Sequence, residues 1–229
     1  MKHLLRAWVI AGVMAAIAHA QPAPSEEAVR RNNRGAELLK QGKASEAVAD
    51  LRAAIDMAPG FVTAQANLAY AYEQSGQLLE AITAYEKLLE LDQDNATARN
   101  NLAGVYGRSG RHDDAIRELE TLVQRDPGDA AARRNLEIAK RNKGILDERD
   151  QRSGAAVKAA EARPHDPRAA YDVARVYAQQ GDHEAALTWL GKAFALGYDQ
   201  IDFVNVDPAL AGLRNDPRFG KLVEGRGTR

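Results

Sequence analysis

Apolar residues recur at three- and four-residue intervals along most of the chain, which is the spacing of an amphipathic helix. A representative stretch has Leu68 and Tyr72 four residues apart on one face, then Gly76, then a second apolar stripe. The second stripe comprises Ile82, Tyr85, Leu88 and Leu89. Glycine commonly follows a helix because it adopts a left-handed conformation without strain. The pattern predicts one helix over about residues 62–75, a turn, and another helix over about residues 79–91.

This helix pair recurs with a period of 34 residues. Glycines of the predicted turn, alanines of the second helix and asparagines of the first helix keep the spacing: Gly42, Gly76, Gly110 and Gly144; Ala47, Ala81 and Ala115; Asn33, Asn67, Asn101 and Asn135. Alanine suits a position where two helices approach closely, and Pro59 and Pro127 end units two periods apart because proline cannot continue a helix. Such self-similarity is typical of stacked helix-turn-helix repeats.

The units resemble the tetratricopeptide repeat family, whose pattern places small, aromatic, glycine, alanine and proline residues at fixed offsets. Three units carry the pattern in register: Gly35, Leu38, Gly42, Ala47, Leu51, Ala54 and Pro59; Leu68, Ala69, Tyr72, Gly76, Ala81, Tyr85 and Leu88; Leu102, Ala103, Tyr106, Gly110, Ala115, Leu119, Leu122 and Pro127. The resemblance implies an all-α fold, a right-handed α-solenoid of helix-turn-helix repeats with a short helical C-terminal cap.

The array becomes irregular after the third unit. Lys140 and Arg149 stand where the family pattern has an aromatic residue and an alanine. The predicted division is an extended segment over 21–27, three regular units and the first helix of a fourth over 28–146, an irregular second helix that acts as an elbow over 147–163, a fifth unit over 164–200, and a cap and tail over 201–229. A cap is expected because a terminal repeat otherwise exposes an apolar face.

The first 20 residues have the layout of a secretory signal peptide. Lys2 and Arg6 precede an uncharged apolar run over residues 7–18, and Ala18-His19-Ala20 fits the small-x-small cleavage rule. The run is shorter than the ~20 residues of a membrane-spanning helix, and no cysteine follows it to accept a lipid. We predict cleavage after Ala20, a periplasmic or secreted location, and no stable membrane insertion afterwards. The alternative is an uncleaved membrane anchor.

Composition narrows the classes of function. The chain has no cysteine, which excludes thiol catalysis, thiolate metal sites and disulfides. A formal net charge of −1 leaves no basic excess for nucleic acid. The sequence has no H-E-x-x-H pattern, phosphate-binding glycine loop or G-x-S-x-G motif, and His112, His165 and His183 fall in predicted turns. We therefore expect no enzyme activity, no cofactor and no metal.

The resemblance implies that a concave surface, lined by the first helices, holds segments of other polypeptides. Asparagine side chains offer donors and an acceptor to a peptide backbone, and arginines attract carboxylates. The predicted groove residues are Asn33, Asn67, Tyr70, Asn101, Arg108, Arg134, Asn135, Arg141 and Arg175. Two alternatives stay open: the asparagines tie neighbouring helices together, and the arginines are ordinary solvated charges.

These features together favour a protein–protein interaction scaffold of the bacterial cell envelope. Its expected partners are protein or peptide segments, with acidic segments favoured, and not nucleic acid. The alternative is a structural accessory subunit of an envelope assembly, secretion or wall-synthesis machine, which docks through its convex face or its cap.

Overall fold

A computed structural model describes residues 23–224 and 226. The predicted signal peptide and its cleavage site after Ala20 lie outside the described residues. The first helix begins at Glu26, because the Ser25 hydroxyl accepts the Ala28 amide N–H at 3.2 Å and caps it. The predicted extended segment over 21–27 is therefore too long by two residues at its C-terminal end.

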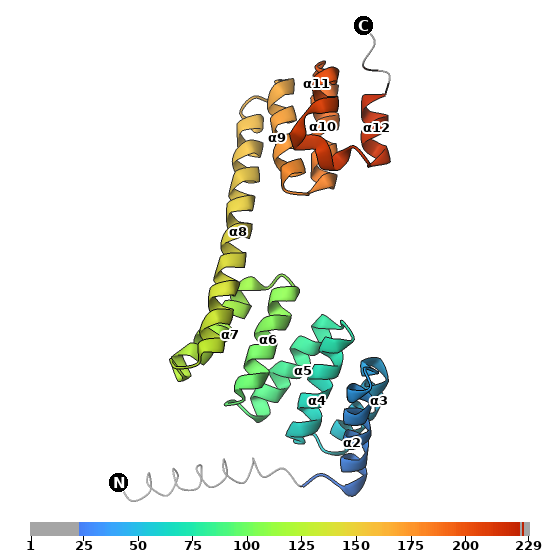
Figure 1. Ribbon diagram of the computed structural model, residues 1–229, viewed down its shortest axis with the longest axis vertical. Coiled ribbons are helices and arrows are strands. Elements are labelled where there is room, and N and C mark those ends of the chain that lie inside the picture. Colours follow the sequence, from blue (N-terminus) through green and yellow to red (C-terminus); the bar gives the residue numbers. More distant parts are fainter. Residues whose placement is uncertain (1–22, 225, 227–229) are drawn as a thin grey trace, which may run out of the picture. The chain divides into compact units, whose positions relative to one another are not determined.

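Three consecutive helix pairs follow in sequence order (Figure 1). They are α2 (Glu26–Lys40) with α3 (Ala44–Met57), α4 (Val62–Gln74) with α5 (Leu78–Leu91), and α6 (Ala96–Arg108) with α7 (His112–Arg125). The turn glycines Gly42, Gly76 and Gly110 have φ angles of 74°, 77° and 80°. In this left-handed region glycine lacks the steric penalty of other residues, so the glycine column does end the first helices as predicted.

The helix pairs enclose one apolar core in this part of the chain. Its members include the alanine column of the second helices and the leucine–tyrosine stripes of the first helices: Ala47, Ala81, Ala115, Leu68, Tyr72, Leu102 and Tyr106. Ala47 and Ala81 are completely buried, as close helix approach requires. The repeat pattern read from the sequence is therefore the packing pattern of the core.

The fourth unit differs from the prediction. A single helix, α8, runs from Ala130 to Glu161, so the prediction that Gly144 ends a helix is wrong. The physical reason lies in the residues that follow. Arg149, which is exposed, replaces the alanine that allows close packing in the other units, and the intervening residues are good helix formers.

The chain divides into two compact units, unit 1 (Met1–Arg141) and unit 2 (Asn142–Arg229). Helix α8 contributes to both. Leu136 and Ala139 pack on the core of unit 1, whereas Ala156, Val157 and Ala160 pack with Ala169 and Val173 in unit 2. The second half of α8 thus does the packing of a second helix without folding back. The elbow over 147–163 stays a prediction.

Unit 2 continues with another helix pair and a cap. Helices α9 (Pro167–Gln179) and α10 (His183–Ala195) lie where the fifth repeat was predicted, and α11 (Ile201–Val206), the 3-10 helix η1 (Pro208–Leu213) and α12 (Pro217–Val223) follow. Asp166, Asp207 and Asp216 each cap a helix that begins with proline. The cap buries Leu210, Leu213 and Phe219 against α9 and α10.

The predicted all-α repeat fold is confirmed, since every regular element over residues 23–224 and 226 is a helix. None of the described helices combines the length and the apolar character that crossing a bilayer requires.

Candidate functional site

The predicted groove residues of unit 1 lie on the first helices α2, α4, α6 and the start of α8. We call this surface the first-helix face; its residues are Asn33, Asn67, Tyr70, Asn101, Arg108, Arg134, Asn135 and Arg141. Three hydrogen bonds fix the register between neighbouring first helices: Asn67 to Asn32, Arg108 to Glu73, and Asn135 to Asn100, each between residues 35 apart. Residues 34 apart therefore stand side by side on this face.

The asparagines of the column tie neighbouring helices together. Asn67 Nδ2 donates to Asn32 Oδ1 at 2.9 Å, and Asn32 Nδ2 donates to Asn33 Oδ1 at 3.3 Å. Asn135 Nδ2 donates to Asn100 Oδ1 at 2.8 Å. A side-chain amide can make four hydrogen bonds, so each asparagine keeps capacity for a further partner. The alternative structural reading holds for this column, and ligand contact stays a prediction.

Asn101 binds differently because Ala66 stands where its neighbours have an asparagine partner. Its Nδ2 atom donates to the Tyr85 hydroxyl at 3.3 Å, and that hydroxyl donates to Glu73 Oε2 at 2.6 Å. Glu73 Oε1 in turn accepts Arg108 Nη2 at 3.0 Å. Burial raises the pKa of Tyr85, and its hydrogen bond to the Glu73 carboxylate raises it further. This network joins α4, α5 and α6.

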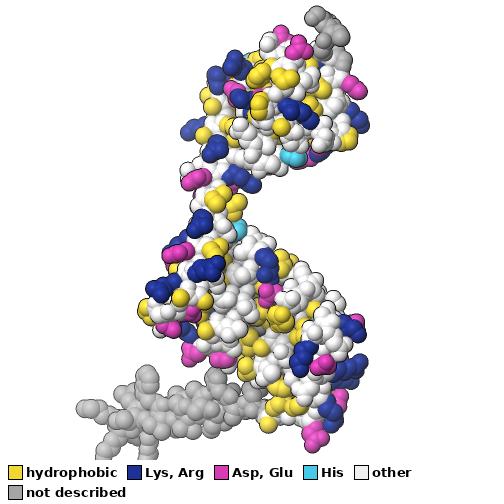
Figure 2. Space-filling model, viewed as in Figure 1, with side chains coloured by type: hydrophobic (Ala, Val, Ile, Leu, Met, Phe, Trp, Pro, Cys, Tyr) yellow, Lys and Arg dark blue, Asp and Glu magenta, His cyan; other side chains and the backbone are white. Residues whose placement is uncertain are grey.

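Arg108 is therefore engaged, but the other two arginines of the first-helix face are not. Arg134 and Arg141 are exposed and form no ion pair with any residue over 23–224 and 226. Tyr70 is also exposed, at 44% of its surface. In Figure 2, basic and acidic side chains are interspersed along α8. Two free guanidinium groups and one exposed aromatic ring are the parts of this face most available to a partner.

Arg175, the predicted groove arginine of unit 2, is anchored in the cap. Its Nε atom lies 2.9 Å from Asp207 Oδ2, and the Tyr171 hydroxyl donates to the same oxygen at 2.7 Å. Asp207 is 1% exposed. Burial raises the pKa of Tyr171, and the hydrogen bond to Asp207 adds to the rise. Arg175 thus holds the cap on α9, although it also reaches the pocket described next.

A pocket of about 260 Å³ opens between α9 and the start of the cap. The Tyr171 and Tyr198 rings stack there with centroids 4.3 Å apart, and Phe203 meets Tyr171 edge to face. The remaining lining residues are Arg168, Asp172, Arg175 and Gln200. Basic and acidic groups alternate along this wall of α9, so the pocket has no strong charge preference.

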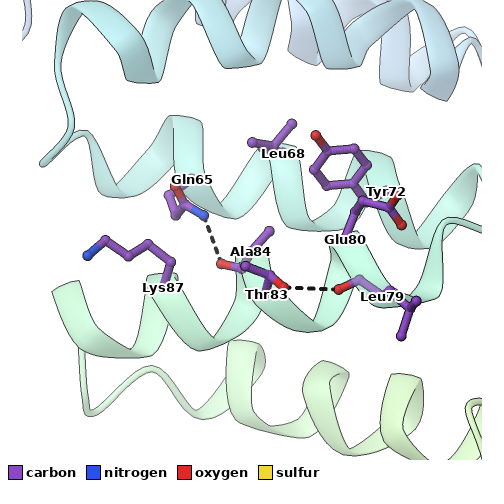
Figure 3. Close-up of a pocket in the computed structure, with 8 residues that line it drawn as sticks. All are labelled: Gln65, Leu68, Tyr72, Leu79, Glu80, Thr83, Ala84 and Lys87. Atoms are coloured by element: carbon purple, nitrogen blue, oxygen red, sulfur yellow. Dashed lines mark hydrogen bonds between the residues drawn. The ribbon is translucent and has the colours of Figure 1, made fainter.

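A second hollow, of about 430 Å³, lies between α4 and α5 (Figure 3). Leu68, Tyr72 and Ala84 line it with apolar surface, and Gln65 Nε2 donates to the Ala84 carbonyl at 2.8 Å. Leu79, at its rim, is 73% exposed. This hollow lies apart from the first-helix face and offers an apolar contact to the second-helix side.

No group of three or more His, Asp or Glu side chains among the described residues could hold a metal ion. Sequence reasoning missed Glu73, Tyr85 and Asp207 as organising residues. Only Asp207 had a local signal, since it precedes Pro208 as a helix cap. The partners of all three lie at least 12 positions away in the chain, where repeat spacing gives no information.

Comparison with known proteins adds the following. A family model described as tetratricopeptide repeat matches residues 74–137, and a second model of the same description matches residues 32–96 and 151–196. Among curated proteins, no sequence matches the chain.

Solved structures share the fold. The structure of MamA 41-end from Desulfovibrio magneticus RS-1 is 21% identical, with 76% of this chain and 97% of that chain covered and a TM-score of 0.50. A MamA RS-1 double mutant is 21% identical, with 78% and 98% covered and a TM-score of 0.50. The Sgt2 TPR domain from Aspergillus fumigatus is 23% identical, with 55% and 85% covered and a TM-score of 0.50. At these identities the likeness is one of fold.

Proposed function

The chain belongs to the tetratricopeptide repeat family, and from that premise we propose that it is a non-catalytic scaffold that binds segments of partner polypeptides on the first-helix face of unit 1. The observation that carries the proposal is the pair of unpaired, exposed arginines Arg134 and Arg141. Other arginines of unit 1 are engaged: Arg31 and Arg34 with Asp50, Arg99 with Glu118, and Arg125 with Asp94.

Free guanidinium groups favour carboxylates as partners, because the guanidinium fork matches the carboxylate in geometry and charge. The asparagine column supports the same reading, since its remaining amide groups can bind a peptide backbone independently of sequence. The favoured partner is therefore an acidic polypeptide segment.

Reversing the charge of both arginines is the test of this proposal. The variant Arg134→Glu/Arg141→Glu is expected to reduce partner binding by residues 21–229 at least tenfold, because two attractive contacts become repulsive. Binding is measured by affinity capture from envelope extract with quantitative mass spectrometry.

The matched control is Arg52→Glu/Arg152→Glu. Both residues are exposed, and both lie outside the first-helix face. This control should capture partners like the unaltered protein. Equal capture by the two double variants would remove the first-helix face from consideration.

Docking through the second-helix side is the second candidate, and the exposed Leu79 beside the apolar hollow of Figure 3 favours it. The protein would then be an accessory subunit fixed in a larger envelope assembly. In that case Leu79→Asp would abolish capture, whereas the double reversal at Arg134 and Arg141 would leave it intact.

Export to the periplasm or the medium is also part of the proposal. It rests on the basic, apolar and small-residue succession of the first 20 residues. Mass spectrometry of the protein recovered from the producing bacterium should find an N-terminus at Gln21 in the periplasmic or extracellular fraction. An intact Met1 in the membrane fraction would instead support the uncleaved anchor.

A further inference from the structure

Gly104 lies in the interior of α6 without a structural reason. A Cβ atom added there meets nothing within 4 Å, and its φ angle is not positive. Gly35 on α2 is the opposite case, because a Cβ there would lie 2.5 Å from Leu51 Cγ. Glycine in a helix interior is destabilising relative to alanine. Neither packing nor backbone conformation explains why Gly104 is tolerated.

The neighbours of Gly104 on the first-helix face are both apolar and exposed. The register of the hydrogen bonds between first helices places residues 34 apart side by side, so Tyr70 of α4 and Ile138 of α8 flank Gly104. Tyr70 is 44% exposed and Ile138 is 41% exposed. Gly104 itself is exposed. Bare backbone between two apolar side chains leaves room for one apolar side chain of a partner.

The charges around Ile138 are basic on both sides along α8. Arg134 and Arg141 share its face at the i−4 and i+3 positions. Residues 130–141 contain four basic side chains, Arg133, Arg134, Lys140 and Arg141, and one acidic side chain, Glu137. Lys140 pairs with Glu120 at 2.7 Å, and Glu137 forms an ion pair with neither arginine of this face. The site therefore offers an apolar centre with a positive charge above and below it.

These dimensions select one class of ligand. The helix rise places Arg134 about 6 Å and Arg141 about 4.5 Å from Ile138 along the axis. In an extended peptide, second neighbours project to the same side about 6.6–7 Å apart. A carboxylate two residues before and another two residues after one apolar residue would therefore reach both arginines.

We propose that the first-helix face around Gly104 binds an extended segment in which one apolar residue, seated over Gly104 between Tyr70 and Ile138, has acidic residues as its second neighbours on both sides. The inference rests on the proposed function and specifies its ligand. Arg134 and Arg141 hold the two carboxylates, and the absent side chain at position 104 makes the space for the apolar residue.

The test uses residues 21–229 and the peptide acetyl-Gly-Glu-Gly-Leu-Gly-Glu-Gly-amide in a calorimetric titration. The scrambled peptide acetyl-Gly-Glu-Glu-Gly-Gly-Leu-Gly-amide has the same composition and charge. The ordered peptide is expected to bind at least tenfold more tightly than the scrambled one. Equal affinity for the two peptides would overturn the proposed spacing.

Substitution at position 104 separates this inference from the general function. Gly104→Leu is expected to raise the thermal midpoint, because leucine is a better helix former and meets open space, yet to weaken binding of the ordered peptide at least tenfold. The control Gly154→Ala, also at an exposed helical glycine with nothing within 4 Å of a Cβ, should raise the midpoint and leave binding unchanged.

The two failures are distinguishable. If Gly104→Leu binds the ordered peptide as the unaltered protein does, while Arg134→Glu/Arg141→Glu still loses envelope partners, the apolar seat is wrong and the scaffold function stands. If the double reversal also keeps its envelope partners, the proposed function itself fails.

Discussion

Replacing Asp207 by alanine is expected to lower the free energy of unfolding of unit 2 by about 3–5 kcal/mol, the usual cost of removing one partner from a buried ion pair. Asp207 is 1% exposed and serves three groups at once. Its Oδ2 atom receives the Tyr171 hydroxyl and lies beside the Arg175 guanidinium, and its Oδ1 atom receives the Ala209 amide N–H at 2.9 Å.

All three groups lose their acceptor in the Asp207→Ala variant. The Tyr171 ring is buried beneath Tyr198, so water cannot readily replace the carboxylate. The loss of the η1 cap adds to the cost, since an N-cap aspartate alone is worth about 1 kcal/mol. The cap should consequently detach from α9 at lower denaturant concentration than in the unaltered protein.

Trp189 makes the measurement specific to unit 2. It is the single tryptophan of residues 21–229, since the other one is Trp8, and it packs against the core of unit 2. Urea unfolding followed by its fluorescence should show the lowered midpoint. Asp199→Ala, at an exposed carboxylate bonded to Gln200 alone among the described residues, is the control. Equal midpoints for the two variants would show that the Asp207 contacts contribute little.

The regular part of the fold was predictable because each repeat position has a local physical reason. Glycine at 42, 76 and 110 has a left-handed φ angle at a chain reversal, and alanine at 47 and 81 lies where helices touch. Gly144 has the same spacing but no reversal, because a glycine permits a turn without requiring one. The deciding residue was Arg149, whose bulk removes the close helix contact that would reward the turn.

The candidate site was predictable in position but not in bonding. The spacing placed Asn67, Asn101 and Asn135 on one face, and the structure keeps them there. Which group each amide binds depends on the residue before the column in the neighbouring unit: asparagine at 32 and 100, alanine at 66. Likewise, the role of Arg175 depends on Asp207, which no repeat unit contains.

The tightest contact in unit 1 gives the last prediction. Leu51→Ala is expected to lower the free energy of unfolding of unit 1 by about 2–5 kcal/mol, because Leu51 is completely buried and its loss leaves a cavity. Gly35→Ala is expected to cost about 1–3 kcal/mol by overpacking, since its Cβ would lie 2.5 Å from Leu51 Cγ and 2.7 Å from Leu51 Cδ2.

The two substitutions should partly cancel when combined. The methyl group of Gly35→Ala enters the space that Leu51→Ala vacates, so the double variant should be more stable than the sum of the two losses by at least ~1 kcal/mol. Helical circular dichroism in urea measures this coupling, and unchanged Trp189 fluorescence over the same transition assigns it to unit 1. Strict additivity would mean that α2 moves away from α3 to accept the methyl group, and that Gly35 is not the residue that sets their separation.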